Sequence, residues 1–509
     1  MRRLSAIHID KFYKDSFTLT LSNMATGIIS FIFSIILSRE LGAEGLGLYG
    51  LVMPVYGLLL CITTDGLITA ISKITTLYFH RKEYRNLKRT VSTAFLFVAA
   101  WSACVALLVL VCHSFIAEHI VKDPRAAGAI MILSPALIFV PLSAVIKGYF
   151  YGLGQYKVTA SVDILEKFLR VSILLGAIMI LSPGSDVSKT VTIAYFSLAT
   201  GEAVSLLLLF ICYKIRNSKL KGNTGKSISR IQLIFDVFVI SVPLCAEGVI
   251  SSLISALSAL VLPHRLVAAG LTYSDALAMI GRFCGMALNI TTLPYIIIGS
   301  MLTVLVTELS PGISKRDYWT AEERIAQIIR ISGVIGISTA LMCLRIPDTL
   351  GLLFYKRNDL GEMIRFGALI RLIMFVSMPT FGILNALGRQ NTLLKNSLIN
   401  SAQSLLLIFL LAGIPVLNIY GYGLSIILTA ITSFILNIRE IKKVCEIKVT
   451  LQDVVTLALI GIAVWLASGI VMNFLGGASP VVMTAGIVIT CFGGMLCMYR
   501  LTFRHREES

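Results

Sequence analysis

Charged residues are scarce in this chain. Only 14% of its 509 residues are Asp, Glu, Lys or Arg, against roughly 25% in an ordinary soluble domain, whereas 56% are hydrophobic. This balance excludes a soluble fold. The alternating apolar and polar pattern of membrane strands is also absent, which excludes a β-barrel. The remaining class is an all-α membrane protein, because a helix satisfies its own backbone hydrogen bonds inside lipid.

Motifs for catalysis and for metal binding are missing too. The ten Cys residues occur singly, with no zinc-like or disulfide-like spacing, and the six His residues are dispersed. The segment Gly222–Ser227 resembles a phosphate loop, but its spacing is two residues short and no buried strand precedes it. The basic start Met1–Asp15 has no cleavable apolar core, so we expect no signal peptide. We expect no enzyme, no resident metal and no cofactor.

Long apolar runs are what the chain does contain. About 20 apolar residues in a helix cross the hydrocarbon layer, and the sequence predicts about fourteen such spans. They cover residues 16–38, 46–72, 91–112, 127–147, 158–181, 191–213, 232–262, 275–308, 325–346, 363–387, 392–414, 421–438, 454–474 and 480–499.

The basic residues are distributed unequally between the connections. Of the 44 Lys and Arg, thirty fall on one set of alternate connections, which includes both termini, and eight fall on the other. The positive-inside rule therefore places both termini in the cytoplasm of a multi-pass cell-membrane protein. The net charge of +17 follows from these loops and does not indicate a nucleic-acid partner.

Two halves of the chain look alike. The segments Gly148–Gln155 and Gly382–Arg389 each end a predicted span at a Leu-Gly-polar turn, 234 residues apart. A six-span repeat in one orientation predicts two lobes around an axis along the membrane normal. We expect an N-terminal lobe at 1–220, a second lobe at 221–450, and two further helices with the C-terminus at 451–509.

Several segments resemble a known family. Leu37–Gly50, then Gly66 and Ala70–Lys73, resemble the opening of the prokaryotic polysaccharide exporters of the multidrug/oligosaccharidyl-lipid/polysaccharide (MOP) flippase superfamily. The turn Gly148–Gln155 and the predicted spans extend this resemblance over the chain. Within the family the chain resembles the stage V sporulation protein B branch, which is related to the lipid II flippases. The resemblance implies transport of a lipid-linked saccharide, with a role in cell-wall synthesis and sporulation.

Charged side chains within predicted spans are the first candidates for substrate contact, because each is costly in lipid. Lys167 and Arg170 lie near mid-bilayer, each four residues after an acid, Asp163 and Glu166. Two interpretations stay open. The four residues form a self-neutralised ladder along one helix face, or the two cations face a cavity between the lobes and bind a diphosphate headgroup.

Two further arginines belong to this predicted substrate set. Arg282 has no acidic residue three or four positions away, so it needs either a partner from another helix or an anionic substrate. Its position resembles an arginine of the lipid II flippases. Arg39 ends the first predicted span, where snorkelling to the interface is the simpler explanation. The span 16–38 carries no arginine, unlike that of the lipid II flippases, so the saccharide stays open.

Carboxylates and amides within the spans are candidates for ion coupling. Asp65, Glu202, Asp236 and Glu247 could take up a proton or pair with a cation. Asn396, Asn400 and Gln403 follow at helical spacing and could offer neutral oxygens to a hard cation. We predict ion-coupling roles for Glu247, Asp236, Asn396 and Asn400, with Na⁺ or H⁺ as the coupling ion. Interhelical hydrogen bonding is the alternative.

These observations favour a monomeric secondary transporter. We expect it to flip an undecaprenyl-linked saccharide or cell-wall precursor across the membrane by alternating access. One alternative is a cation-coupled multidrug exporter, whose cavity should be acidic or aromatic. The other is a glycosyltransferase, although the longest outer connection, 345–362, is short for a catalytic domain. Acidic partners for both Arg170 and Arg282, together with no hydrated chamber between two bundles, would contradict the hypothesis that these cations bind an anionic substrate.

Overall fold

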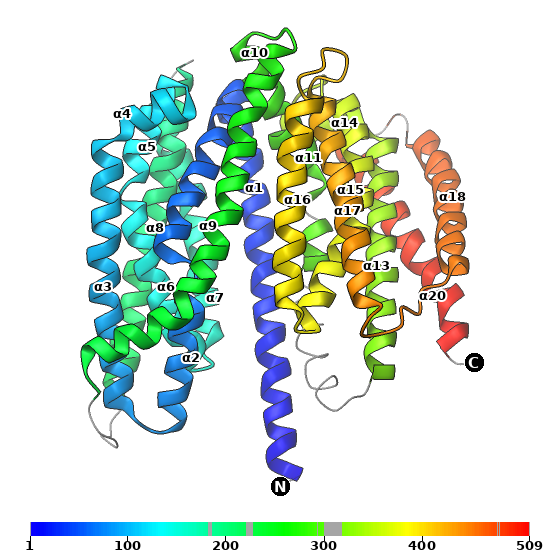
Figure 1. Ribbon diagram of the computed structural model, residues 1–509. Helices are drawn as coiled ribbons and strands as arrows, with labels where there is room; N and C mark the ends of the chain where they lie inside the picture. The colour runs from blue at the N-terminus through cyan, green and yellow to red at the C-terminus, as the bar shows by residue number, and fades with distance from the viewer. Residues whose placement is uncertain are drawn as a thin grey trace. The chain divides into compact units, whose positions relative to one another are not determined.

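The computed structural model describes residues 2–181, 186–219, 228–292, 294–299, 318–475, 477 and 479–507. Over these residues every regular element is a helix (Figure 1). The predicted all-α class is therefore confirmed.

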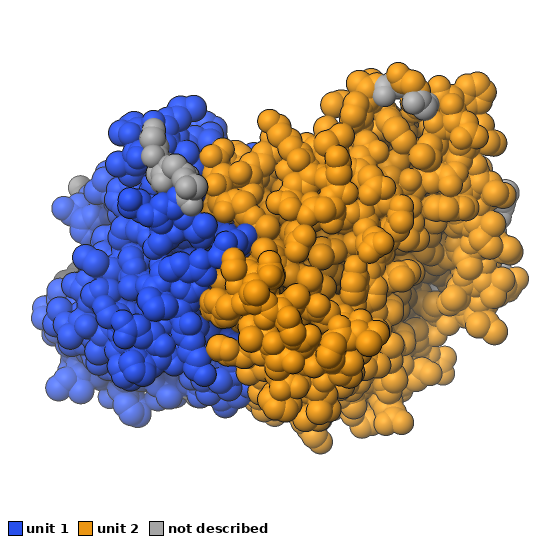
Figure 2. Space-filling model, turned by 90° about the horizontal axis from the view of Figure 1, so that it is seen from above, with its two compact units in different colours: residues 1–33, 44–260 blue, residues 34–43, 261–509 orange. Residues whose placement is uncertain are grey.

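Two compact units divide the chain (Figure 2): unit 1 comprises residues 1–33 and 44–260, and unit 2 comprises residues 34–43 and 261–509. Helices α1 and α9 contribute to both. The helices before residue 269 are α1 Arg2–Thr64, α2 Leu67–His80, α3 Tyr84–Val111, α4 His113–Phe115, η1 Ile116–Val121, η2 Pro124–Ala126, α5 Ala127–Leu133, α6 Ala136–Gly152, α7 Tyr156–Leu181, α8 Val187–Lys219 and α9 Arg230–Ala268.

The remaining helices belong to unit 2. They are α10 Tyr273–Ile280, η3 Gly281–Ala287, α11 Leu288–Ile290, α13 Tyr318–Arg345, α14 Pro347–Tyr355, α15 Gly361–Ala386, α16 Gln390–Leu411, α17 Ile419–Ile441, α18 Leu451–Phe474, α19 Pro480–Val488, η4 Ile489–Gly493 and α20 Gly494–Glu507. The predicted domain limits at 220 and 450 stay predictions, since compactness does not test the proposed repeat.

Eleven helical stretches within the described ranges are long and apolar enough to cross a membrane. The stretch Leu21–His80 covers most of the predicted span 16–38 and all of the predicted span 46–72, and Gly42, at φ 67°, breaks its helix between them. The 26-residue helix α7 is long enough to span but carries Asp163, Glu166, Lys167 and Arg170. The predicted span 275–308 lies partly outside the described residues. The count of fourteen and the two-lobe repeat stay predictions.

The two Leu-Gly-polar turns have the same local geometry. Gly154 and Gly388 adopt φ values of 66° and 71°, which a residue with a Cβ rarely takes. After each glycine the chain closes back on its helix: Gln155 N donates to Phe150 O at 2.9 Å, and Arg389 N donates to Leu384 O at 3.1 Å. These turns end α6 and α15, as the sequence predicts.

Two glycines of α6 lie where this helix comes into close contact with α2. A Cβ added to Gly148 would lie 2.9 Å from Ile71 Cβ, and one added to Gly152 would lie 2.6 Å from Ser72 O, both on α2. The small residues therefore let α2 and α6 approach closely. Helix α6 also packs on α3 and α8, around buried side chains that include Leu87 and Tyr149.

Unit 2 has its own core. Helix α15 packs between α13 and α17, and α17 also packs on α16 (Figure 1). The α15 side chains Phe375, Ile383 and Leu384 are fully buried there.

Large apolar side chains also cover the outside of the helices. Ile180 is 83% exposed, Leu459 61% and Leu466 64%. A soluble monomer rarely exposes apolar residues so extensively, whereas lipid solvates them. The exposed faces therefore match the membrane location that the composition predicts.

Candidate functional site

Unit 1 contains a cluster of charges on α6, α7 and α8. Arg170 Nη2 lies 2.6 Å from Glu166 Oε1 and 3.1 Å from Glu202 Oε1, and Glu166 is only 3% exposed. Lys167 Nζ lies 2.8 Å from Glu166 Oε2. The predicted Glu166–Arg170 pair is therefore present.

The predicted Asp163–Lys167 pair is wrong. Asp163 instead pairs with Lys147 of α6 at 2.7 Å, because α7 packs on its neighbours and its inward charges find partners there. Three cations and three carboxylates then make the whole cluster neutral. Arg170 and Lys167 consequently do not need a bound anion to balance their charge.

Arg282 finds its partner outside its own helix. It lies in the π-helical turn η3, and its Nη1 is 3.2 Å from Asp359 Oδ2, on the connection between α14 and α15. Arg357 Nη2 lies 2.6 Å from the same oxygen. Hydrogen bonds from Arg357 and Arg282 lower the pKa of Asp359 to about 2, against the desolvation that raises it.

The Arg282 cluster has more positive than negative charge. Two guanidinium groups share the one Asp359 carboxylate. In addition, the buried Nε of Arg282 has no hydrogen-bond partner among the described residues. A buried donor without a partner is costly, so this site has the capacity to accept an anionic group.

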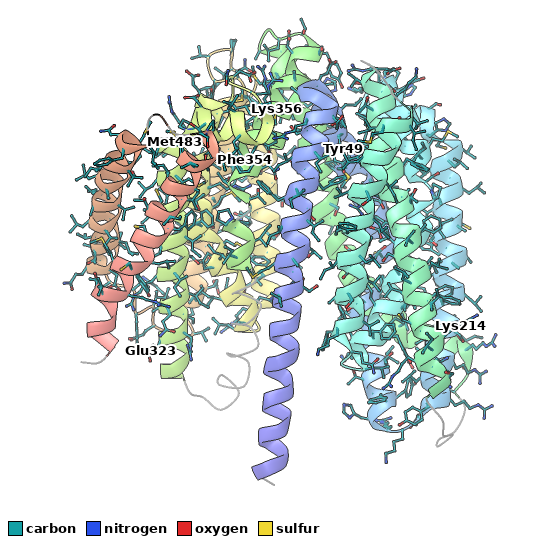
Figure 3. The ribbon with its side chains drawn as sticks, turned by 180° about the vertical axis from the view of Figure 1, so that it is seen from behind. Tyr49, Lys214, Glu323, Phe354, Lys356 and Met483 are labelled. Carbon is teal, nitrogen blue, oxygen red and sulfur yellow. The ribbon has the colours of Figure 1, made fainter. Side chains whose placement is uncertain are left out.

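Arg39 donates hydrogen bonds to backbone carbonyl groups of α14. Its Nε donates to Phe354 O at 2.7 Å and its Nη2 to Leu353 O at 2.8 Å. These carbonyls belong to the last turn of α14, near the labelled Phe354 and Lys356 in Figure 3. A cation at the C-terminal end of a helix is favourable, so the geometry gives Arg39 a structural role.

Arg371 of α15 is a functional candidate that the sequence analysis did not select. Its Nε donates to Thr291 Oγ1 at 2.9 Å, its Nη2 donates to Thr292 Oγ1 at 3.0 Å, and its guanidinium stacks over Tyr295 at 5.2 Å. No carboxylate pairs with it within the described part of the chain. The test that identified Arg282, no acid at three or four positions on either side, also identifies Arg371.

Asn396 and Asn400 of α16 come together in a polar pocket of about 270 Å³ against α17. Asn396 Nδ2 donates to Asn437 Oδ1 at 2.9 Å, and Asn437 Nδ2 donates to Thr380 Oγ1 at 3.0 Å. Interhelical hydrogen bonding, the alternative to ion binding, therefore accounts for Asn396. It also accounts for Gln403, which donates to Thr432 Oγ1 at 3.0 Å.

We call this cavity, which is lined by Asn396, Asn400 and Asn437, the amide pocket. Two of its buried oxygens make no hydrogen bond to a described residue. Asn400 Oδ1 and Thr429 Oγ1 both lack a hydrogen-bond partner among the described residues, and both residues line the pocket. Neutral oxygens in a polar cavity suit a hard monovalent or divalent cation. Thr429 could have been found from the sequence, because Thr429, Ser433 and Asn437 follow one another at helical spacing on α17.

The other two ion-coupling candidates lie on α9. Asp236 accepts a hydrogen bond from Gln232 Nε2 at 2.8 Å, one turn earlier on an exposed face. The Glu247 side chain lies outside the described residues. Their predicted roles therefore stay predictions.

Comparison with known proteins identifies the family of this chain. A family model described as "Polysaccharide biosynthesis protein" matches residues 12–307, and the chain belongs to this family. It is a multi-pass membrane protein of the MOP flippase type, as its apolar helices and its relatives both indicate. The predicted family and its stage V sporulation protein B-like branch are confirmed.

Particular relatives support the same placement. The chain is 27% identical over 478 residues to stage V sporulation protein B of Bacillus subtilis strain 168, covering 93% of this chain and 92% of that protein. It is 22% identical over 352 residues to the lipid II flippase MurJ of the same organism, covering 64% of each. An inward-facing multidrug resistance MATE family transporter of the MOP superfamily shares the fold, with a TM-score of 0.64 and 14% identity over 82% of this chain and 95% of that chain.

Proposed function

We propose that this protein is a secondary transporter that moves an undecaprenyl-linked saccharide or cell-wall precursor from the cytoplasmic to the outer leaflet of the cell membrane. Its family and its similarity to stage V sporulation protein B and to a lipid II flippase support a lipid-linked substrate. Such a headgroup cannot cross hydrocarbon unaided, because its sugars and phosphates would lose their hydration. Alternating access exposes one binding site to each side of the membrane in turn.

The excess positive charge at Arg282 is the observation that carries this proposal. Arg282 and Arg357 share Asp359, and Arg282 Nε is still free to donate. A diphosphate offers several acceptor oxygens to such planar guanidinium forks. Arg371, held by hydroxyl groups and without a described carboxylate partner, adds a third cation in the same unit.

The other predicted substrate residues have weaker support. Arg170 and Lys167 would have to exchange Glu166 and Glu202 for phosphate, and breaking a buried ion pair is costly. Arg39 would have to leave two carbonyl groups of α14. We keep the three as secondary candidates for the headgroup site.

We propose the amide pocket as the site of a coupling cation. Asn400 Oδ1 and Thr429 Oγ1 are acceptors without described donors, and neither group can bind a proton at ordinary pH. Na⁺ fits this chemistry better than H⁺. Asp236 and Glu247 stay candidates for a proton-linked step.

Two alternatives are less well supported. The likeness to MATE transporters is one of fold, and the positive charge at Arg282 favours an anionic substrate over an organic cation. A glycosyltransferase has no support from the names of the relatives, which indicate transport or sporulation.

Native mass spectrometry of the purified full-length protein tests the substrate class. We expect an undecaprenyl phosphate or diphosphate saccharide to co-purify with the protein, and the adduct to be lost from an Arg282→Ala, Arg357→Ala double variant. Co-purification of the same lipid with the double variant would contradict the proposed headgroup site. Absence of any polyprenyl lipid from the wild-type protein, with transport of organic cations instead, would contradict the proposed function.

A further inference from the structure

Unit 1 contains a cavity that the proposed function does not use. Its volume is about 370 Å³, within the range of about 300–1,000 Å³ that is typical of small-molecule sites. The lining comes from the end of α1, the start of α2, the middle of α3 and the first half of α9. We call it the Asp65 pocket, because Asp65 supplies its carboxylate.

The walls of the Asp65 pocket are apolar and aromatic. Phe97 and Trp101 of α3 line it together with Phe238 of α9, and the rings of Phe97 and Phe238 meet edge to face at 5.0 Å. Trp101 Nε1 donates to Ile62 O at 3.3 Å, which fixes the indole beside the end of α1. Phe97 is 37% exposed and Trp101 45% exposed, so the aromatic wall also reaches the apolar outside of unit 1.

Asp65 lies at the break between α1 and α2. The helix stops at Thr64 because Gly66 takes φ 79°, and α2 begins at Leu67. The carboxylate sits against Gly248 of α9, where an added Cβ would overlap it. The Cys61 thiol lies beside this carboxylate and is also 2.8 Å from Ser252 Oγ.

Among the described residues, no Lys or Arg forms an ion pair with Asp65. At 1.5 Å per helical residue, Trp101 lies about 25 Å from the start of α3 and Cys245 about 22 Å from the start of α9. Asp65 and the α3 wall therefore lie within stretches that are long and apolar enough to cross a membrane, Leu21–His80 and Tyr84–Val111. A carboxylate inside such a stretch is costly unless a cation pairs with it.

We infer that the Asp65 pocket binds a hydrophobic organic monocation. The apolar walls would take the body of the ligand, the aromatic faces of Phe97, Trp101 and Phe238 would attract its positive charge, and the Asp65 carboxylate would pair with it. A lipid chain would fill the same walls but would leave the carboxylate unpaired. This site goes beyond the proposed function, whose substrate is an anion, and it does not depend on it.

Binding of tetraphenylphosphonium to the full-length protein tests this inference. The protein is placed in nanodiscs of neutral phosphatidylcholine, because anionic lipid would itself attract the probe. The chain has three tryptophans, so Trp319→Phe and Trp465→Phe leave Trp101 as the reporter by fluorescence. We expect saturable quenching of Trp101, and an affinity about tenfold lower in Asp65→Asn, which corresponds to roughly 1.4 kcal/mol.

Matched variants make the result decisive. Asp186→Asn removes an exposed carboxylate of unit 1 outside the pocket lining and should leave the affinity unchanged. Asp65→Glu keeps the negative charge and should retain binding. This variant therefore tests the role of the charge if Asp65→Asn does not fold. Equal affinity of wild type and Asp65→Asn would overturn the inference. Equal competition by the neutral isostere tetraphenylmethane would also overturn it, by showing that the pocket takes any apolar body.

Discussion

Arg282 Nη1 lies 3.2 Å from Asp359 Oδ2, and Arg357 Nη2 lies 2.6 Å from the same oxygen. Arg282 thus has an acidic partner, but it shares this partner with a second cation. Arg170, in contrast, sits in a neutral cluster with Glu166 and Glu202. The two arginines that the sequence grouped together therefore differ in the balance of charge around them, although the buried Nε of each has no hydrogen-bond partner among the described residues.

Replacing Arg282 with Ala should reduce flipping of the lipid-linked substrate by tenfold or more. The reason is that a charge-assisted hydrogen bond to phosphate is worth about 1.5–3 kcal/mol. The rate is measured in proteoliposomes with the lipid identified by mass spectrometry. Arg365→Ala is the control, because Arg365 makes only a long, exposed contact of 3.7 Å with Asp348. Transport at the wild-type rate by Arg282→Ala would exclude this residue from the site.

The Asp359 ion pairs should weaken in acid. The folded pKa of Asp359 is about 2, below its ordinary 3.8, so its stabilising contribution is complete above pH 4 and is lost as the pH falls from about 4 to 2. The side chain is 40% exposed, so solvent screening limits the contribution to about 1 kcal/mol or less. We expect the difference in unfolding temperature between wild type and Asp359→Asn to shrink over this interval. A difference that grows with acidity would show that the pKa shift has the opposite sign.

Thr429→Val and Asn400→Ala should weaken the dependence of transport on the coupling cation. Each removes one of the two unpartnered oxygens of the amide pocket, and Thr429→Val nearly preserves the volume. We expect the Na⁺ concentration for half-maximal transport to rise by about tenfold, as the loss of one ligand worth roughly 1.4 kcal/mol implies. Thr456→Val on α18, whose hydroxyl bonds to Gln452 O, is the control. An unchanged Na⁺ dependence in both variants would place the coupling ion elsewhere.

The sequence predicted the class of the fold because apolar runs and basic loops follow directly from solvation by lipid and water. It also predicted the turns at Gly154 and Gly388, since a helix that ends in the left-handed region favours glycine. Pairing within one helix was partly predictable, as Glu166 and Arg170 show. The partners of Asp163 and Arg282 were not, because Lys147 and Asp359 are distant in sequence and only helix packing brings them close.

The amide pocket shows the same limit. Asn396 and Asn400 lie four residues apart on one helix, so their common face was predictable from periodicity. Asn396 bonds to Asn437 of α17, whereas Asn400 keeps an oxygen without a described partner. This difference depends on the side chains that α17 presents, namely Asn437 and Thr429. A single sequence does not report that packing.

Arg330 of α13 and Asp453 of α18 provide a test of stability. Arg330 Nη2 lies 3.0 Å from Asp453 Oδ2 and also donates to Lys448 O at 3.1 Å, whereas Asp453 is fully buried and caps α18 together with Thr450. Arg330→Met should therefore destabilise the protein by about 3 kcal/mol, because it removes a cation that pairs with a buried carboxylate.

Asp453→Asn should cost less than Arg330→Met. The asparagine oxygen can still accept the Thr450 N–H, and Arg330, whose side chain is 17% exposed, can reach water. The double variant Arg330→Met, Asp453→Asn should then be more stable than Arg330→Met alone, since the buried negative charge is gone. Chemical unfolding of the four proteins in detergent measures this coupling. Strictly additive effects would show that the two side chains do not stabilise each other, and that α13 and α18 are held by apolar packing alone.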